Sequence, residues 1–323
     1  MSLGNPERAV GGLAVRAPAG VELRPLGRSD LADAVAMARL LHGQPPLENV
    51  APLGGRLDAL LGSADVVPFL ATEDDRPIGL GMVQFRRRLN FPSFEGWVSD
   101  LFVAERERGR GVGRALLDAL IAEWRLRGAH RLQAKAPDGA VAAAGLYQAA
   151  RFEEWMLDFR LRPLPAAAPP GGEVRIRDAD ERDFEAVTAL IGQFGVQRQP
   201  SEERMDAVRR AYLAQLAEAA AGRGALAVAE EEGRLVGVCA MEWQRPFWTD
   251  EVHGWLPDLI VDEAARGHGI GRALLDDVVA RARAAGAAQL SLESGPAREA
   301  AHALYRSSGF AEAGRTWLLR RDP

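Results

Sequence analysis

The sequence has a single cysteine, Cys239, among 323 residues, which excludes an internal disulfide and fits a reducing cytoplasm. Because Cys239 lies in an apolar stretch, we expect a buried structural thiol rather than a nucleophile. No apolar run approaches the roughly 20 residues that a membrane-spanning helix needs, and the N-terminus lacks the apolar core of a signal peptide. The formal net charge of −5 argues against a nucleic-acid binder that relies on overall basicity. These absences predict a cytoplasmic protein that binds neither membrane nor nucleic acid.

What the chain does contain is an internal repeat. Hydrophobic residues make up 47% and charged residues 26%, as in ordinary globular proteins, and the length suggests two domains. Residues 97–132 align with residues 255–290 without a gap, and 19 of the 36 positions are identical. Such a repeat is too long for a solenoid unit and large enough to bury its own core. We therefore expect one domain over residues 1–163 and another over 173–323, joined by a proline- and glycine-rich linker over 164–172.

Both copies show the same order of expected elements. A strand, a helical segment and a hairpin come first, and a strand then runs into a glycine-rich loop, followed by a helix, a strand, a helix and a last strand. The expected strands of the N-terminal copy cover 21–26, 66–72, 78–85, 97–103 and 131–136, and the last begins at Phe152. Those of the C-terminal copy cover 174–177, 225–229, 235–243, 255–261 and 289–293, and the last begins at Phe310. This order predicts an α/β fold in which each copy is a mixed sheet flanked by helices.

The two glycine-rich loops are the strongest chemical signal. They run Arg108-Gly-Arg-Gly-Val-Gly113 and Arg266-Gly-His-Gly-Ile-Gly271, each between a strand and a helix. Glycines let backbone N–H groups approach an anion, and the start of the following helix adds partial positive charge, so a diphosphate is the natural guest. A P-loop is excluded because neither loop has its lysine. A dinucleotide fingerprint is disfavoured because Arg114 and Arg272 stand where a small residue should pack.

With these loops, each half of the chain resembles the GNAT superfamily of N-acyltransferases, which use acyl-CoA. The motifs of the N-terminal copy are the strand Asp100-Leu-Phe-Val103, its glycine loop, an amphipathic helix, and Leu146-Tyr147 ahead of Phe152. Those of the C-terminal copy are Asp258-Leu-Ile-Val261, its own loop, and Leu304-Tyr305 ahead of Gly309-Phe310. The resemblance implies two tandem GNAT-like domains, each with a mixed, mostly antiparallel sheet flanked by helices.

The resemblance also implies that acetyl-CoA is the cosubstrate, without a metal. Its diphosphate is expected on the loop amides, and its pantetheine arm beside the strand that precedes the loop. In the N-terminal copy the implied contact residues are Leu101, Phe102, Val103, Arg108, Gly109, Arg110, Gly111, Val112, Gly113 and Arg114. In the C-terminal copy they are Leu259, Ile260, Val261, Arg266, Gly267, His268, Gly269, Ile270, Gly271 and Arg272.

The reaction implied by the resemblance is direct attack of an amine on the thioester, which needs no protein nucleophile. Tyr305, and in the N-terminal copy Tyr147, are implied as the acid that protonates the leaving thiolate. An amine with a pKa near 10 is charged at neutral pH, so a base would help. Candidate bases at the start of the strand before the loop are His253 and Glu251 in the C-terminal copy and Glu95 in the N-terminal copy.

Other titratable residues are expected to be structural or ordinary. Asp100 and Asp258 point to the opposite face of their strands by alternation, and His42 resembles a surface or packing histidine. Residues 243–255 combine aromatic side chains with acids, which suits a cationic amine, whereas the arginines within residues 85–97 would repel one. Aromatic packing around the strands explains these segments equally well.

Together these features predict a cytoplasmic tandem acyl-CoA-dependent N-acyltransferase that transfers acetyl groups to a primary amine. The C-terminal copy is the favoured catalytic one because of Tyr305, whereas the N-terminal copy departs from the family pattern with Arg151 where the C-terminal copy has Gly309. A small molecule is favoured over a protein as the acceptor. The alternative is an acyl-CoA-binding regulatory or interaction protein in which one or both copies are not catalytic.

Overall fold

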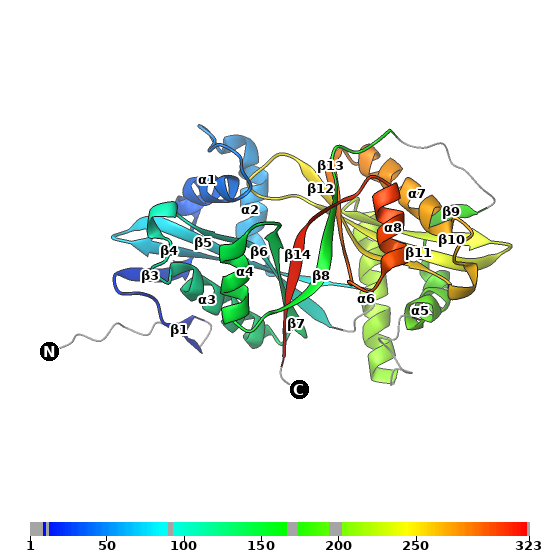
Figure 1. Ribbon diagram of the computed structural model, residues 1–323, viewed down its shortest axis with the longest axis horizontal. Helices are drawn as coiled ribbons and strands as arrows, with labels where there is room; N and C mark the ends of the chain where they lie inside the picture. The colour runs from blue at the N-terminus through cyan, green and yellow to red at the C-terminus, as the bar shows by residue number, and fades with distance from the viewer. Residues whose placement is uncertain (1–8, 11–12, 90–92, 167–173, 194–201, 322–323) are drawn as a thin grey trace.

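The computed structural model describes residues 9–10, 13–89, 93–166, 174–193 and 202–321. Two similar halves lie side by side, and strands of both lie next to one another at the centre (Figure 1). Residues 167–172 of the expected linker lie outside the described part of the chain. Among the helices described, none is both long enough and apolar enough to cross a membrane.

The N-terminal copy begins with a small separate ladder and then follows the expected order. The ladder pairs β1 (Ala9–Val10) with β2 (Leu13–Ala14). The copy continues with β3 (Val21–Pro25), α1 (Leu31–Leu41), α2 (Gly54–Gly62), β4 (Val66–Glu73), β5 (Arg76–Arg87), β6 (Phe94–Val103), α3 (Val112–Arg127), β7 (Arg131–Pro137), α4 (Val141–Ala149) and β8 (Glu153–Leu161).

The C-terminal copy repeats this order, which confirms the prediction for both copies. It consists of β9 (Arg175–Asp178), α5 (Phe184–Gly192), α6 (Glu202–Ala220), β10 (Gly224–Glu231), β11 (Arg234–Gln244), β12 (Val252–Val261), α7 (Ile270–Ala284), β13 (Ala287–Ser294), α8 (Glu299–Ser307) and β14 (Ala311–Arg320). One difference is size, because α6 has 19 residues and α2, its counterpart, has 9.

Tight turns close the two expected hairpins. Asp74 and Asp75 between β4 and β5 have φ values of 49° and 61°, and Glu232 and Gly233 between β10 and β11 have 50° and 78°. Two consecutive residues with positive φ are what a two-residue hairpin turn needs to match the twist of its strands. The same local geometry therefore forms each hairpin, although only one of the four residues is glycine.

The strands other than β1 and β2 form one sheet of twelve strands, in the order β3-β4-β5-β6-β7-β14-β8-β13-β12-β11-β10-β9. Only the β6–β7 and β12–β13 pairs are parallel. The mixed, mostly antiparallel sheet is thus confirmed, but the copies are not separate sheets. The last strand of the C-terminal copy, β14, pairs with β7, and the last strand of the N-terminal copy, β8, pairs with β13.

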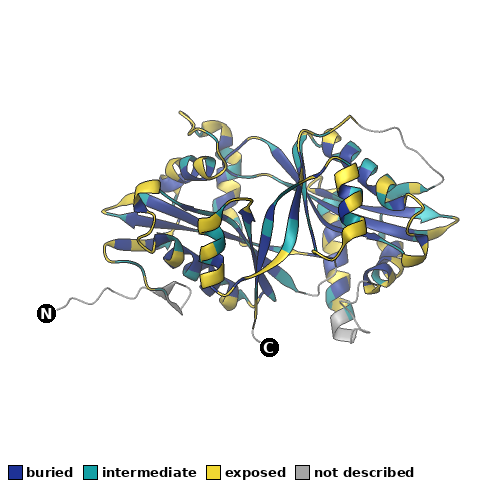
Figure 2. Ribbon diagram, viewed as in Figure 1, coloured by how far each residue is buried: buried dark blue, intermediate teal, exposed yellow. Residues whose placement is uncertain are grey.

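This exchange gives each hydrophobic core a side chain from the other copy. Trp317 of β14 is buried in the N-terminal core, where its ring lies 6.3 Å from that of Tyr147. Phe159 of β8 is buried in the C-terminal core, where its ring lies 5.5 Å from that of Tyr305. Figure 2 shows that the inner strands of both halves are largely buried. Each core is therefore completed by the other copy, which the expectation of two self-contained cores did not include.

Charged side chains gather where the two copies meet. The carboxylate of Glu95, at the start of β6, accepts hydrogen bonds from Nε of Arg86 at 2.8 Å and Nε of Arg131 at 2.7 Å, and Nε of Arg88 lies 3.2 Å away. Burial alone would raise the pKa of Glu95, but the three guanidinium charges outweigh it and lower the pKa to about 2. Glu95 is therefore ionised, and its role is to hold the three arginines at the place where the copies meet.

A second ion pair joins equivalent positions of the two copies. Lys135 of β7 and Glu293 of β13 lie 158 residues apart in the repeat, and Nζ of Lys135 is 2.8 Å from the carboxylate of Glu293. Arg88 also donates to Glu293 at 3.0 Å, and Lys135 to Asp158 at 2.6 Å. Opposite charges thus meet at equivalent positions of the two copies. Two identical subunits would have the same residue at both positions and would bring like charges together.

The exchanged strands predict that the two halves unfold together. Trp317→Ala should lower the free energy of unfolding by about 3–5 kcal/mol, because it empties a buried site in the N-terminal core. Urea denaturation followed by circular dichroism and by fluorescence should give one coincident transition, moved to lower urea. Trp155→Ala is the control, since Trp155 lies on β8 with 38% of its surface exposed and should cost little. Two separate transitions, only one of them shifted, would show that the halves are independent.

The arginines around Glu95 predict a pH dependence of stability. Because the pKa of Glu95 is lowered from 4.5 to about 2, its contribution is fully present above about pH 4.5 and disappears as the pH falls through 2. Glu95→Gln should cost about 3–5 kcal/mol at pH 7, since it leaves buried arginines without their carboxylate, and this cost should shrink toward pH 2. Urea midpoints at pH 7, 4.5 and 3 measure both effects. A cost that did not change across this range would contradict the assignment.

Candidate active site

The paired strands β6 and β7 separate partway along their length, and so do β12 and β13. The last parallel pairs are Val98 with Ala134 and Leu256 with Leu292. A register shift interrupts the β5–β6 pairing at Ser99 and the β11–β12 pairing next to Leu256. Beyond these points lie the predicted contact residues 101–103 and 259–261. They pair with β5 or β11 along one backbone edge, and their other edge has left β7 or β13. In each copy the two parallel strands therefore stop pairing ahead of the glycine loop, and we call this place the opening.

The loops have the backbone that the sequence predicts. Gly109 and Gly111 have φ values of 78° and 88°, and Gly267 and Gly269 have 87° and 81°. These left-handed conformations favour glycine. The first hydrogen bonds of the following helices run from the amide of residue 115 to Gly111 and from that of residue 273 to Gly269, so the preceding amides lie at the open helix ends. Both loops fit a diphosphate with backbone donors.

The side chains of the loop arginines bind neighbouring strands and helices. Nε of Arg108 donates to the carbonyl of Val103 at 3.2 Å, and Nε of Arg266 donates to the carbonyl of Val261 at 3.4 Å, so each fixes the end of its strand. Arg114 and Arg272 each bind an aspartate one turn later on their helices and reach the last turn of α4 or α8. Backbone amides are thus the main phosphate donors that each loop offers.

Arg110 occupies the place in its loop that His268 has in the other, and it is paired with two carboxylates. Hydrogen bonds from Arg110 to Glu73 and Glu107 raise the pKa of Arg110. These two carboxylates offset the positive charge of Arg110. Arg110 would therefore attract a phosphate less strongly than an unpaired arginine would.

Both candidate acids are buried on the last helix of their copy. The hydroxyl of Tyr147 on α4 donates weakly, at 3.5 Å, to the carbonyl of Lys135, the residue that follows the last β6–β7 pair. Tyr305 on α8 packs against Phe159 and Phe310. Burial raises the pKa of both tyrosines to about 12. Each therefore keeps its proton at neutral pH, as a proton donor must.

The turn after α4 has a different sequence from its counterpart after α8 but the same backbone. Arg151 has a φ of 65°, and Gly309, its counterpart, has a φ of 90°. The amide of Phe152 donates to the carbonyl of Tyr147 at 2.9 Å, and that of Phe310 donates to Tyr305 at 3.0 Å. The turn behind the tyrosine is therefore the same in both copies, despite the side chain of Arg151.

The predicted bases have partners that leave them little capacity for proton transfer. Glu95 is held by three arginines. Nε2 of His253 donates to Glu251 at 3.1 Å, and its Nδ1 accepts from Gln289 at 3.2 Å. Burial lowers the pKa of His253. Hydrogen bonds from Arg162 lower the pKa of Glu251.

The position of these residues also argues against the base role. Glu95 and His253 lie about four residues before the point where the strands separate, and this spacing corresponds to about 13 Å along a strand. The packing thus gives no support to Glu95, His253 or Glu251 as the base.

A histidine that sequence reasoning set aside lies at the opening instead. His42 follows α1, and its Nε2 is 3.3 Å from Oδ1 of Asp100, one residue beyond the shift at Ser99. The imidazole stacks on Trp248 of the C-terminal copy. These residues are far apart in sequence, so no local spacing could have indicated the cluster. Cys239 is buried with a raised pKa, which confirms a structural thiol.

Each copy sends the loop after its third long strand onto the other. Leu89, which follows β5, packs with Phe184 and Ile260 in the C-terminal copy. Phe247, its counterpart after β11, packs with Leu57 and Phe102 in the N-terminal copy. Each copy therefore contributes a buried apolar side chain to a core cluster of the other.

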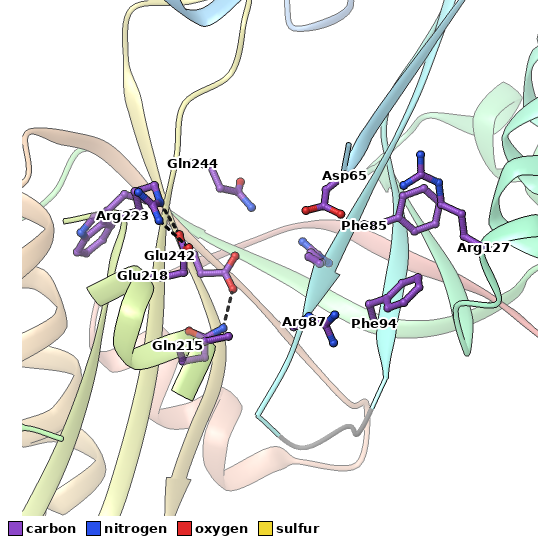
Figure 3. Close-up of a pocket in the computed structure, with 13 residues that line it drawn as sticks. Asp65, Phe85, Arg87, Phe94, Arg127, Gln215, Glu218, Arg223, Glu242 and Gln244 are labelled. Carbon is purple, nitrogen blue, oxygen red and sulfur yellow. Dashed lines mark hydrogen bonds and ion pairs between the residues drawn. The ribbon is translucent and has the colours of Figure 1, made fainter. Parts of the chain in front are cut away.

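A pocket of about 450 Å³ lies between the copies (Figure 3). Equivalent residues of both copies line it, among them Phe85 with Trp243 and Arg86 with Gln244. In it Glu242 accepts a hydrogen bond from Gln215 at 3.2 Å, and burial raises the pKa of Glu242. The two segments that carried clues to the acceptor thus meet in one shared pocket.

Comparisons with known proteins agree with this geometry. The model of the acetyltransferase (GNAT) family matches residues 37–152 and again residues 185–310. An IAA acetyltransferase from Azospirillum brasilense is 39% identical over 96 residues, which is 30% of this chain. The match spans 60% of the length of that curated relative.

Solved structures show the same fold over nearly the whole chain. A GCN5-related N-acetyltransferase from Sphaerobacter thermophilus has a TM-score of 0.61 at 20% identity, covering 95% of this chain and 96% of that one. A tandem GNAT protein from the clavulanic acid biosynthesis pathway has a TM-score of 0.61 at 16% identity, covering 94% and 99%. With two matches to the family model and this shared architecture, the chain belongs to the acetyltransferase (GNAT) family and carries two copies of its domain.

Proposed function

We propose that this protein is an N-acyltransferase that transfers the acetyl group of acetyl-CoA to a primary amine by direct attack. The observation that carries the proposal is the twofold combination of a strand opening, a glycine loop at a helix start and a buried tyrosine beside it. Acetyl-CoA would supply the activated thioester. The loop amides would bind its diphosphate, and the free edges of residues 101–103 and 259–261 would orient its pantetheine arm.

During transfer, residues around the opening would stabilise the charge that develops on the carbonyl oxygen and would protonate the leaving sulfur. A backbone N–H at the register shift can donate to the carbonyl oxygen as negative charge develops there. Pro257 follows the last paired residue of β12 and has no N–H, whereas Ser99 at the same position of the repeat has one. The tyrosine hydroxyl can then give its proton to the leaving sulfur.

We further propose that the N-terminal copy carries the chemistry. From the sequence, the C-terminal copy is favoured because of Tyr305 and because the N-terminal copy has Arg151 in place of glycine. However, Arg151 adopts the same left-handed backbone conformation as Gly309, and Tyr147 is buried as Tyr305 is, so neither reason separates the copies in the structure. Ser99 keeps the N–H that Pro257 lacks, and only the N-terminal copy has a histidine at the end of its first long helix. The C-terminal copy would bind acetyl-CoA and support the N-terminal site.

A small acceptor is supported by the way the copies cover each other. Leu89 and Phe247 are buried against the faces where an acceptor would approach, which leaves little room for a polypeptide. The same covering favours the alternative, an acyl-CoA-binding protein without turnover. Acetyl-CoA binding with no product from a broad panel of amines would select that alternative.

Binding stoichiometry tests whether both loops hold acetyl-CoA. Calorimetry should give two sites per chain in the wild type and one in each of Gly111→Glu and Gly269→Glu, because the added carboxylate repels the diphosphate. Gly111→Ala and Gly269→Ala are matched controls that add the backbone strain of about 1–2 kcal/mol without the charge. Equal loss in the alanine and glutamate variants would assign the effect to strain. No binding in the wild type would overturn the proposed function.

The tyrosines test which copy is catalytic. Tyr147→Phe should lower kcat by about 100-fold, because the leaving thiolate loses its acid, while acetyl-CoA affinity stays unchanged. Tyr305→Phe is the matched control and should leave kcat close to that of the wild type. Steady-state release of CoA thiol measures both. A loss confined to Tyr305→Phe would return the chemistry to the C-terminal copy.

A further inference from the structure

His42, the residue that follows α1, lies against a buried carboxylate. Its Nε2 lies 3.3 Å from Oδ1 of Asp100, whose side chain is 3% exposed, whereas the His42 side chain is 36% exposed. Asp100 lies on β6 next to Ser99, where the strands separate. The pair therefore combines a buried carboxylate with an accessible imidazole at the opening of the N-terminal copy.

The hydrogen bond fixes which nitrogen can accept a proton. A carboxylate only accepts, so Nε2 of His42 must carry the hydrogen, and Nδ1 has the free lone pair. Among the described residues, none donates a hydrogen bond to Nδ1. This is the tautomer that a general base needs. It contrasts with His253, where both ring nitrogens have partners.

The C-terminal copy completes this site. The ring of Trp248 stacks on that of His42 with centroids 4.1 Å apart and planes at 16°. Its loop is anchored from the N-terminal copy, because Arg39 donates to the carbonyl of Trp248 at 3.1 Å and Arg56 donates to that of Glu251 at 2.8 Å. Two arginines thus hold the indole in place over the imidazole.

Several charged groups surround the imidazole. Asp100 faces it from β6 and Arg39 lies on α1. From the C-terminal copy, His253 packs edge-on against the other side of Trp248, with centroids 5.9 Å apart, and Glu251 binds both His253 and Arg162. Asp100 is the carboxylate in hydrogen-bond distance of His42, so it determines the tautomer.

The equivalent place in the C-terminal copy is built differently. Gln193 follows α5 as His42 follows α1, but its amide group binds Asp262 and the amide of Glu263. Asp258, the counterpart of Asp100, is buried near Arg88 and accepts from the backbone of Leu89. Neither residue of the pair is available there as a base.

We propose that His42, oriented by Asp100 and covered by Trp248, is the general base of the N-terminal site, an inference that rests on the proposed function. As the amine nitrogen forms its bond to the acetyl carbon, Nδ1 of His42 takes the proton that the nitrogen loses. The carbon–sulfur bond breaks, and the hydroxyl proton of Tyr147 goes to the sulfur. Proton exchange with water restores both groups.

The test compares pH profiles of kcat/KM for an accepted amine. His42→Gln should lower kcat/KM by about 100-fold and remove the rise of kcat/KM with pH that a general base produces. Asp100→Asn should lower kcat by about tenfold, because an amide no longer enforces the tautomer. Calorimetric affinity for acetyl-CoA and the melting temperature should stay as in the wild type.

Two variants act as controls. Gln193→Ala changes the equivalent helix end in the C-terminal copy and should leave the profile unchanged, and His253→Gln tests the competing histidine. An unchanged profile in His42→Gln, or loss of the rise in His253→Gln alone, would overturn the inference while leaving the proposed function intact. Acetyl-CoA binding without turnover in the wild type would overturn both.

Discussion

The pairing of β8 with β14 is the interaction on which the rest of the structure depends. Each of these strands belongs to one copy in the chain and completes the sheet and core of the other. Without these two strands, β7 and β13 would be sheet edges beside the two openings. The exchange also holds Tyr147 against Trp317 and Tyr305 against Phe159.

Joining the copies in one chain lets equivalent residues differ. A symmetric dimer would place two lysines or two glutamates where Lys135 meets Glu293, and buried like charges repel. The cluster around Glu95 is asymmetric for the same reason, because its counterpart is His253. The contact surface has thus diverged into a form that only two different partners can make.

The same divergence reaches the two openings. The glycine loops, their positive φ values and the turns behind the tyrosines are nearly identical, so the features that suit acetyl-CoA are symmetric. The features that would serve an acceptor are not: His42 pairs with Asp100, whereas Gln193 binds elsewhere. This pattern is what two cofactor sites with one reaction centre would produce.

The sequence by itself determined the repeat, the element order, the glycine loops and the tyrosines, because each depends on local periodicity or on a motif within a few residues. It also indicated Cys239 as a buried thiol. Tertiary structure alone decided the strand exchange, since either last strand satisfies the same hydrogen-bonding edge. It also decided which of the candidate bases are engaged by other side chains. Glu95 and His253 lie in suitable positions along the chain, but neighbours distant in sequence engage them, while the fold brings His42, Asp100 and Trp248 together from three separate segments.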